Sequence, residues 1–153
     1  MEFDIRKPLQ ELDPDTWNPE ALDEELGPLV KRLAHKPVRR LTAGELRELI
    51  TRGLSLACSI PLAIDKLVDE PFLEAQRYPG DLLTAVLEAD TRFWAEREDL
   101  WWAMVPVLEQ AVAAINTRME AEEREDYLPW HLGDDFMAAL IHFRGIHRTD
   151  GAQ

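Results

Sequence analysis

The sequence predicts an all-α protein, a single-domain compact bundle of about six helices formed by residues 1–153. Apolar residues recur with helical spacing along most of the chain, and no segment of useful length alternates between apolar and polar residues. Ten prolines separate these helical segments, as expected of residues that begin or end helices. A chain of 153 residues can form one hydrophobic core and is too short for two ordinary domains.

The first predicted helix opens at Asn18-Pro19, where Asn suits the N-cap and Pro the first helical position. It ends before Pro37, and Gly27-Pro28 either kinks it or divides it into two pieces. Its apolar face consists of Leu22, Leu26, Leu29, Val30 and Leu33.

The second helix follows Thr42, which forms a capping box with Glu45. Gly53 suits the left-handed residue after its end. Its buried stripe is Leu46, Leu49 and Ile50. The third helix starts at Ser59 and stops at Pro71, and its predicted buried side is Ile60, Ala63, Ile64, Leu67 and Val68.

Three further helices follow. A turn at Tyr78-Pro79-Gly80-Asp81 leads into a short helix that carries Leu82, Leu83, Val86 and Leu87. The longest helical pattern extends from Trp101 to Ile115, and Pro106 inside it predicts a kink or a break. After a polar stretch over residues 118–126, the last helix opens near Asp134 and is predicted to bury Phe136, Met137, Leu140 and Ile141.

Charge excludes two classes of ligand. The formal net charge is −13, whereas nucleic-acid binding and docking on anionic membranes both require a cationic face. The charge is uneven: residues 1–30 carry −7, residues 31–52 carry +5 and residues 53–126 carry −10. We therefore expect neither nucleic acid nor a membrane as the partner. A basic protein remains possible, and so does a small ligand in an ordinary pocket.

The chain carries no motif for catalysis or metal binding. Its four histidines never stand three or four residues apart, and no Gly-rich phosphate loop or nucleophile elbow is present. Cys58, the single cysteine, lies in an apolar segment and is expected to be a packed thiol. We expect no catalytic residue, no metal and no cofactor, and we predict that the protein is not an enzyme. A single cysteine and an acidic N-terminus without a signal peptide indicate the cytoplasm.

The sequence shows stronger signs of a protein-binding surface than of a catalytic or metal site. Trp101 and Trp102 are adjacent, so helical geometry separates them by about 100° and only one can face the core. Trp102 is either an exposed anchor for a partner or covered by a second layer of the fold. Acidic side chains are predicted to form an anionic docking face, with a merely solvated surface as the alternative. The predicted partner-binding residues are Asp13, Asp15, Glu20, Asp23, Glu24, Trp102, Glu120, Glu122 and Glu123.

The order of several landmarks resembles a known family. The landmarks are Leu9-x-x-Leu12, Trp17, Lys36-Pro37, Leu41-Thr42, Leu46-Arg47-x-Leu49-Ile50, Gly53, Pro61-Leu62-Ala63, Tyr78-Pro79-Gly80-Asp81-Leu82-Leu83, Val86-Leu87 and Phe93-Trp94. Over roughly residues 9–115 the chain resembles the immunity proteins of bacterial contact-dependent growth inhibition (CDI) systems.

The resemblance implies that the protein binds and neutralises the C-terminal domain of a cognate CDI toxin in the cytoplasm. Many such toxin domains are nucleases, which are basic because they hold phosphates, and an acidic partner would suit them. The landmarks themselves look like scaffold, and the resemblance transfers no contact residue. Two alternatives remain: a helical enzyme or small-ligand carrier with a cavity lined by Trp94, Trp101 and Met104, or an acidic regulator of another basic protein.

Overall fold

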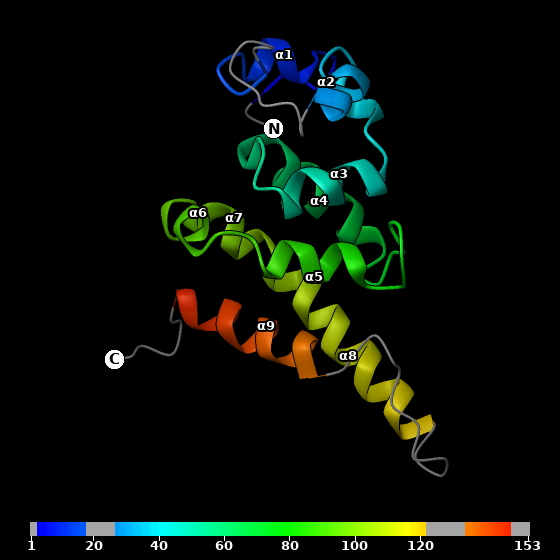
Figure 1. The fold of residues 1–153 in the computed structure, drawn as a ribbon. Coiled ribbons are helices and arrows are strands. Elements are labelled where there is room, and N and C mark those ends of the chain that lie inside the picture. Colours follow the sequence, from blue (N-terminus) through cyan, green and yellow to red (C-terminus); the bar gives the residue numbers. More distant parts are fainter. Residues whose placement is uncertain (1–2, 18–26, 122–133, 148–153) are drawn as a thin grey trace.

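The computed structural model describes residues 3–17, 27–121 and 134–147 (Figure 1). Across these ranges the chain forms nine α-helices and one 3₁₀-helix. Only two isolated β-bridges occur in them, Pro8 with Pro37 and Glu74 with Pro79, and neither belongs to a strand. The all-α prediction is confirmed. No helix in the described part of the chain is both long and apolar enough to cross a bilayer.

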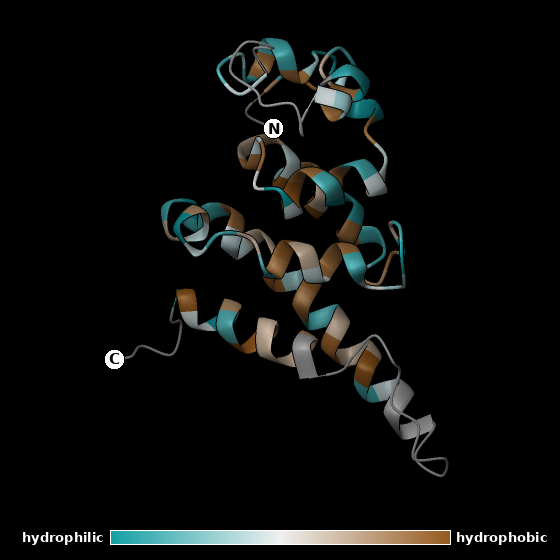
Figure 2. Cartoon of the chain, viewed as in Figure 1, coloured by the Kyte–Doolittle hydropathy of each residue, from teal (hydrophilic) through white to brown (hydrophobic). Residues whose placement is uncertain are grey.

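The helices are stacked from the N-terminal to the C-terminal end of the molecule (Figure 1). The first half of the stack contains α1 (Leu9–Leu12), α2 (Gly27–Leu33), the 3₁₀-helix η1 (Val38–Arg40), α3 (Ala43–Thr51) and α4 (Leu56–Asp69). The second half contains α5 (Asp81–Leu87), α6 (Thr91–Glu96), α7 (Glu98–Ala103), α8 (Val105–Ala121) and α9 (Asp134–Ile146). Hydrophobic residues are found mainly on the turns where successive helices face one another, and hydrophilic residues mainly on the outer turns and loops (Figure 2).

The core is continuous and contains large aromatic side chains. Trp17, Trp94 and Phe143 are each at most 1% exposed. Trp94 packs edge-on against Phe143, with ring centroids 4.8 Å apart. The apolar family landmarks Leu9, Leu46, Leu49, Leu82, Leu83, Val86 and Leu87 are completely buried. Their burial agrees with the expectation that these landmarks are scaffold.

The predicted start of α3 is confirmed in detail. The Thr42 hydroxyl accepts a hydrogen bond from the Glu45 amide at 3.1 Å, and the Glu45 carboxylate accepts one from the Thr42 amide at 2.9 Å. This reciprocal pair satisfies two amides that a helix start leaves without partners. Gly53, after the helix end, has φ +70°, the left-handed conformation that its position predicted.

One helix begins elsewhere than predicted. The predicted helix start at Asn18 lies outside the described residues, and α2 is described from Gly27 to Leu33. α4 begins at Leu56 and includes Pro61 inside the helix. An interior proline costs about 3 kcal/mol. Burial of seven side chains along α4 offsets that cost.

The predicted helix from Trp101 to Ile115 is divided in two. α7 ends at Ala103, α8 starts at Val105, and Met104 forms a turn between them. Pro106 therefore lies in the first turn of α8, where its missing N–H is no loss. The break is thus confirmed, and α8 continues beyond Ile115 to Ala121, into the polar stretch over residues 118–126. The short helix α6, which buries only Trp94, was not predicted.

The turn before α5 is fixed by a buried carboxylate. Asp81 is 1% exposed, and its side chain accepts hydrogen bonds from the amides of Ala75, Gln76 and Arg77 at 2.7, 2.9 and 2.8 Å. The Arg47 Nε atom lies 3.7 Å from Asp81 Oδ2. Burial acts to raise the pKa of Asp81, but the three amide donors and the Arg47 charge together lower it. The carboxylate therefore holds residues 75–77 against the start of α5.

Three side chains predicted to be buried are exposed. Phe136 and Leu140 on α9 are buried, but Met137 and Ile141 are 44% and 67% exposed. α9 packs mainly on α5 and α6, so only one part of its broad apolar arc faces the core. Val68, in the last turn of α4, is 43% exposed, which also contradicts the prediction.

Candidate partner-binding surface

Helix α7 presents one tryptophan to the core and the next to solvent. Trp101 is 4% exposed and Trp102 is 48% exposed, as expected for adjacent residues on a helix. The indole Nε1 of Trp102 donates to Glu98 Oε1 at 3.3 Å, one turn earlier. The anchor interpretation of Trp102 thus has the exposed side chain that it requires.

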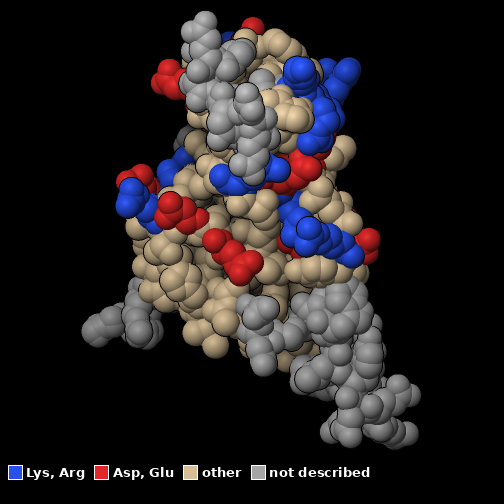
Figure 3. Space-filling model, viewed as in Figure 1, with Lys and Arg blue, Asp and Glu red and all other residues tan. Residues whose placement is uncertain are grey.

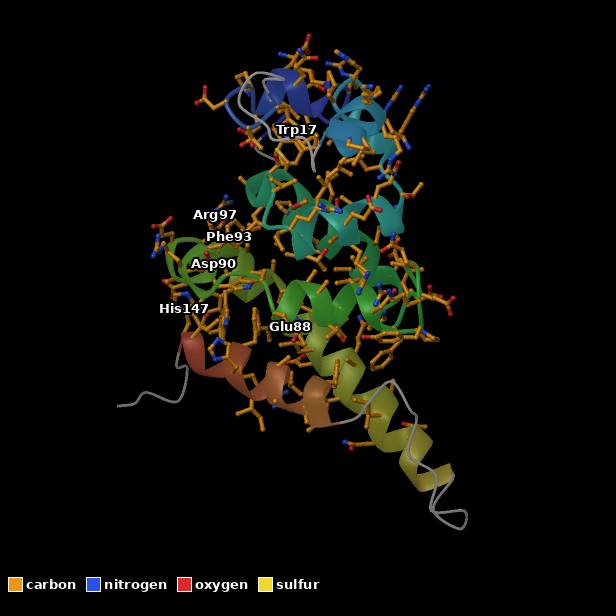
Figure 4. All side chains as sticks on the ribbon, viewed as in Figure 1. Trp17, Glu88, Asp90, Phe93, Arg97 and His147 are labelled. Carbon is orange, nitrogen blue, oxygen red and sulfur yellow. The ribbon has the colours of Figure 1, made fainter. Side chains whose placement is uncertain are left out.

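Contacts with α9 fix the orientation of α7. Trp101 Nε1 donates to the backbone carbonyl of Phe143 at 2.9 Å, and the two rings stack 5.7 Å apart at 19°. His147, just after α9, lies 2.7 Å from the Trp94 carbonyl through Nε2 and packs edge-on against Trp101. Figure 4 shows His147 on the same flank of the molecule as Phe93 and Arg97. Because Trp101 is fixed on both sides, Trp102 projects from a rigid support.

A shallow depression of about 220 Å³ lies beside Trp102. It is lined by Trp101, Trp102, Val105, Leu108, Glu109 and Arg144. The two indole rings meet edge-on inside it, with centroids 5.1 Å apart. Trp102 of α7 and Glu109 of α8 therefore line the same depression.

Acidic side chains adjoin the exposed tryptophan. Glu98, Asp99 and Glu109 are all exposed. Arg97 donates to both carboxylate oxygens of Asp99 at 3.0 Å, and these hydrogen bonds lower the pKa of Asp99. Elsewhere, Lys and Arg side chains gather over α2 and the segment after it, and Asp and Glu side chains lie over α6 and beside α5 (Figure 3). The surface around α7 thus combines a large apolar side chain with negative charge.

The structure brings few of the other predicted acids together. Asp15 is exposed, whereas Asp13 is half-buried and accepts a hydrogen bond from the Ser55 hydroxyl at 2.7 Å. Ser55 in turn accepts from Trp17 Nε1 at 2.7 Å, so Asp13 supports the fold around a core tryptophan. The predicted acids Glu20, Asp23, Glu24, Glu122 and Glu123 lie outside the described residues, and Glu120 lies on α8 without a described side chain.

Sequence reasoning missed two acids on α7, Glu98 and Asp99, of which Glu98 contacts Trp102. Glu98 precedes Trp102 by four residues, which places both side chains on one helical face. The four-residue spacing could have revealed Glu98, but only if the helix had been predicted to start there. The predicted helix began at Trp101. Asp99 was missed for the same reason, because it precedes Trp102 by three residues and lies before the predicted helix start.

The described residues offer little for catalysis or metal binding. No group of three or more His, Cys, Asp or Glu side chains among them is arranged to hold a metal ion. Cys58 is buried, as expected, and burial raises the pKa of its thiol to about 11, with a further contribution from the Asp13 charge. The thiol is therefore protonated at neutral pH and a poor nucleophile.

The residues of the cavity hypothesis belong to the hydrophobic core. Trp94 and Met104 are completely buried, and Trp101 is 4% exposed, stacks on Phe143 and also lines the depression beside Trp102. A rigid helical scaffold with an exposed tryptophan among acids has the features of a protein-binding module.

The chain belongs to the CDI immunity proteins, whose family model matches residues 11–102. The match extends from α1 to α7 and ends at Trp102, so α8 and α9 lie outside it. It confirms the resemblance seen in the landmarks. No curated protein and no solved structure matches the chain. Membership of this family implies that the protein neutralises a toxin.

Proposed function

We propose that the protein neutralises a cognate CDI toxin by binding its C-terminal domain in the cytoplasm, and that this toxin domain is a basic nuclease. The observation that carries the proposal is Trp102, nearly half exposed between Glu98 and Glu109 on a chain of this family. An aromatic anchor surrounded by acids suits a cationic protein surface. The net charge of −13 favours fast encounter with such a surface.

The contact residues that we propose are Trp102 with Glu98, Asp99 and Glu109 around it. Asp15, Glu20, Asp23, Glu24, Glu120, Glu122 and Glu123 are further candidates for electrostatic attraction. We exclude Asp13 from any charge-reversal test, because its hydrogen bond with Ser55 supports the fold. Rim charges of this kind act mainly on the association rate.

The test is binding to the toxin domain encoded immediately upstream of this gene. Wild-type protein should co-purify with that domain and abolish its nuclease activity. W102A should weaken binding by about 30-fold or more, since a buried aromatic anchor contributes about 2 kcal/mol or more. V68A provides the matched control, because Val68 is similarly exposed, at 43%, on another helix.

Two results would contradict the proposal. Failure of the wild-type protein to bind any toxin domain encoded beside its gene would remove the proposed function. Equal binding by W102A and V68A would remove Trp102 from the contact surface.

A further inference from the structure

A second depression, of about 250 Å³, lies on the other flank of α7. Its apolar walls come from three separate parts of the chain: the N-terminal segment, α4 and α7. The apolar lining residues are Phe3, Pro61, Ile64, Leu100 and Ala103. We call this depression the α4–α7 groove.

The N-terminal wall of the groove is fixed in place. The carbonyl of Ile5 accepts from the Arg39 amide at 2.9 Å, and that of Lys7 accepts from the Val38 amide at 3.0 Å. These bonds attach the N-terminal segment to η1, and Phe3 packs against the core. A wall that is already ordered loses little conformational entropy when a partner binds.

The rim of the groove carries two carboxylates, Asp65 and Asp99, and the guanidinium of Arg97, which is paired with Asp99. Asp65 is exposed and makes no ion pair with the described residues. The carboxylate of Asp99 is 60% exposed and keeps free lone pairs beside its bonds to Arg97. An apolar floor with such a rim suits an apolar side chain next to a cation.

Helical geometry makes α7 a ridge between the two depressions. On an ideal helix, Glu98 and Trp102 lie on one flank, Ala103 and Leu100 on the other, and Asp99 lies between them. The two lining sets agree with this arrangement. The two depressions therefore lie on opposite sides of the same short helix.

Resting on the proposed function, we propose that the α4–α7 groove receives an apolar side chain of the basic toxin domain, whose neighbouring Lys or Arg meets Asp65 and Asp99. Trp102 is then the projecting anchor of this protein, and the groove is the pocket for an anchor of the partner. Anchors on the two sides of an interface tend to pair in this way.

The test measures toxin-domain affinity for two groove variants, each with a matched control. A103F fills the groove and should weaken binding by about 30-fold or more. A113F adds the same group at an exposed position of α8 and should leave affinity within about twofold. D65K should reduce the association rate by about tenfold and weaken its salt dependence, whereas D69K, one turn further along α4, should change it by less than about twofold.

The D65K variant keeps the test valid if A103F fails to fold, because Asp65 is exposed and makes no ion pair with any described residue. If wild type binds the toxin domain and both groove variants bind as tightly as their controls, the groove inference is wrong and the proposed function stands. If wild type binds no toxin domain, both are wrong. A dimer of this chain that A103F dissociates would assign the groove to a second copy and overturn the inference.

Discussion

The region around α3–α5 buries a charged side chain, whereas the region around α7–α9 exposes large apolar side chains. Near α5 a charged carboxylate is buried, and Asp81 is supplied with three amide donors. Near α9 large apolar side chains are left in water, with Ile141 67% and Trp102 48% exposed. A buried charge that is fully hydrogen-bonded specifies one conformation, whereas exposed apolar side chains mark contact surfaces. The first region therefore acts as scaffold, whereas the second holds the surface that we propose for a partner.

Close packing in the first region leaves no room for change. A Cβ atom added at Gly44 would lie 2.9 Å from Gln76 Cγ and 3.2 Å from the Ala75 carbonyl oxygen. The same two residues donate their amides to Asp81. The α3 helix, the loop and the start of α5 therefore support one another.

The largest effect should come from breaking the buried carboxylate. D81N should lower the free energy of unfolding by about 3 kcal/mol, because the amide cannot accept all three backbone hydrogen bonds and leaves buried donors unpaired. Urea denaturation measures the change. D99N, at a carboxylate that is 60% exposed, is the control and should cost less than about 1 kcal/mol. Equal losses in the two variants would contradict the assignment of Asp81 as a structural residue.

The same carboxylate also predicts a pH dependence. The pKa of Asp81 lies below its ordinary value of 3.8 in the folded state, so the unfolded chain binds this proton more readily. The stabilisation is fully present above that ordinary value and is lost as pH falls through the folded pKa. D81N should lack this part of the acid destabilisation.

A smaller effect should follow from removing the bridge between Asp13 and Trp17. S55A deprives the buried Trp17 indole of its acceptor and should lower the free energy of unfolding by about 2 kcal/mol. Ser55 also has φ 49°, a left-handed conformation. S55G should therefore lose about 1 kcal/mol less than S55A, because glycine adopts this conformation without strain. If both variants unfold at the wild-type urea concentration, the hydrogen-bonded bridge contributes nothing.

The smallest effect should come from the second region. I141Q should change the free energy of unfolding by less than about 0.5 kcal/mol, because the side chain is already mostly in water. L140A, at the adjacent buried position, should cost about 2–5 kcal/mol. Thermal or urea unfolding compares the two. A large loss for I141Q would mean that this face of α9 is part of the scaffold.

The helix boundaries that could be predicted depend on local signals. Each signal acts within one helical turn and depends only on neighbours in the chain. These signals are Thr42 with Glu45, Gly53, Pro106 and Asp134. They located the start and end of α3, the break before α8 and the start of α9 to within a few residues. The exposure of Trp102 was predicted only in part. Helical geometry shows that Trp101 and Trp102 cannot both face the core, but only the fold leaves Trp102 uncovered.

The sequence by itself determined the all-α class, the ends of α3 and the family, because helical periodicity, capping and landmark order are local properties of the chain. Only the tertiary structure decided which part of an apolar arc is buried. Phe136, Met137, Leu140 and Ile141 follow one pattern, and packing on α5 and α6 covers just Phe136 and Leu140. It also decided the bridge from Trp17 to Asp13 and the α4–α7 groove, because the residues that form them are tens of positions apart and meet only when the helices pack.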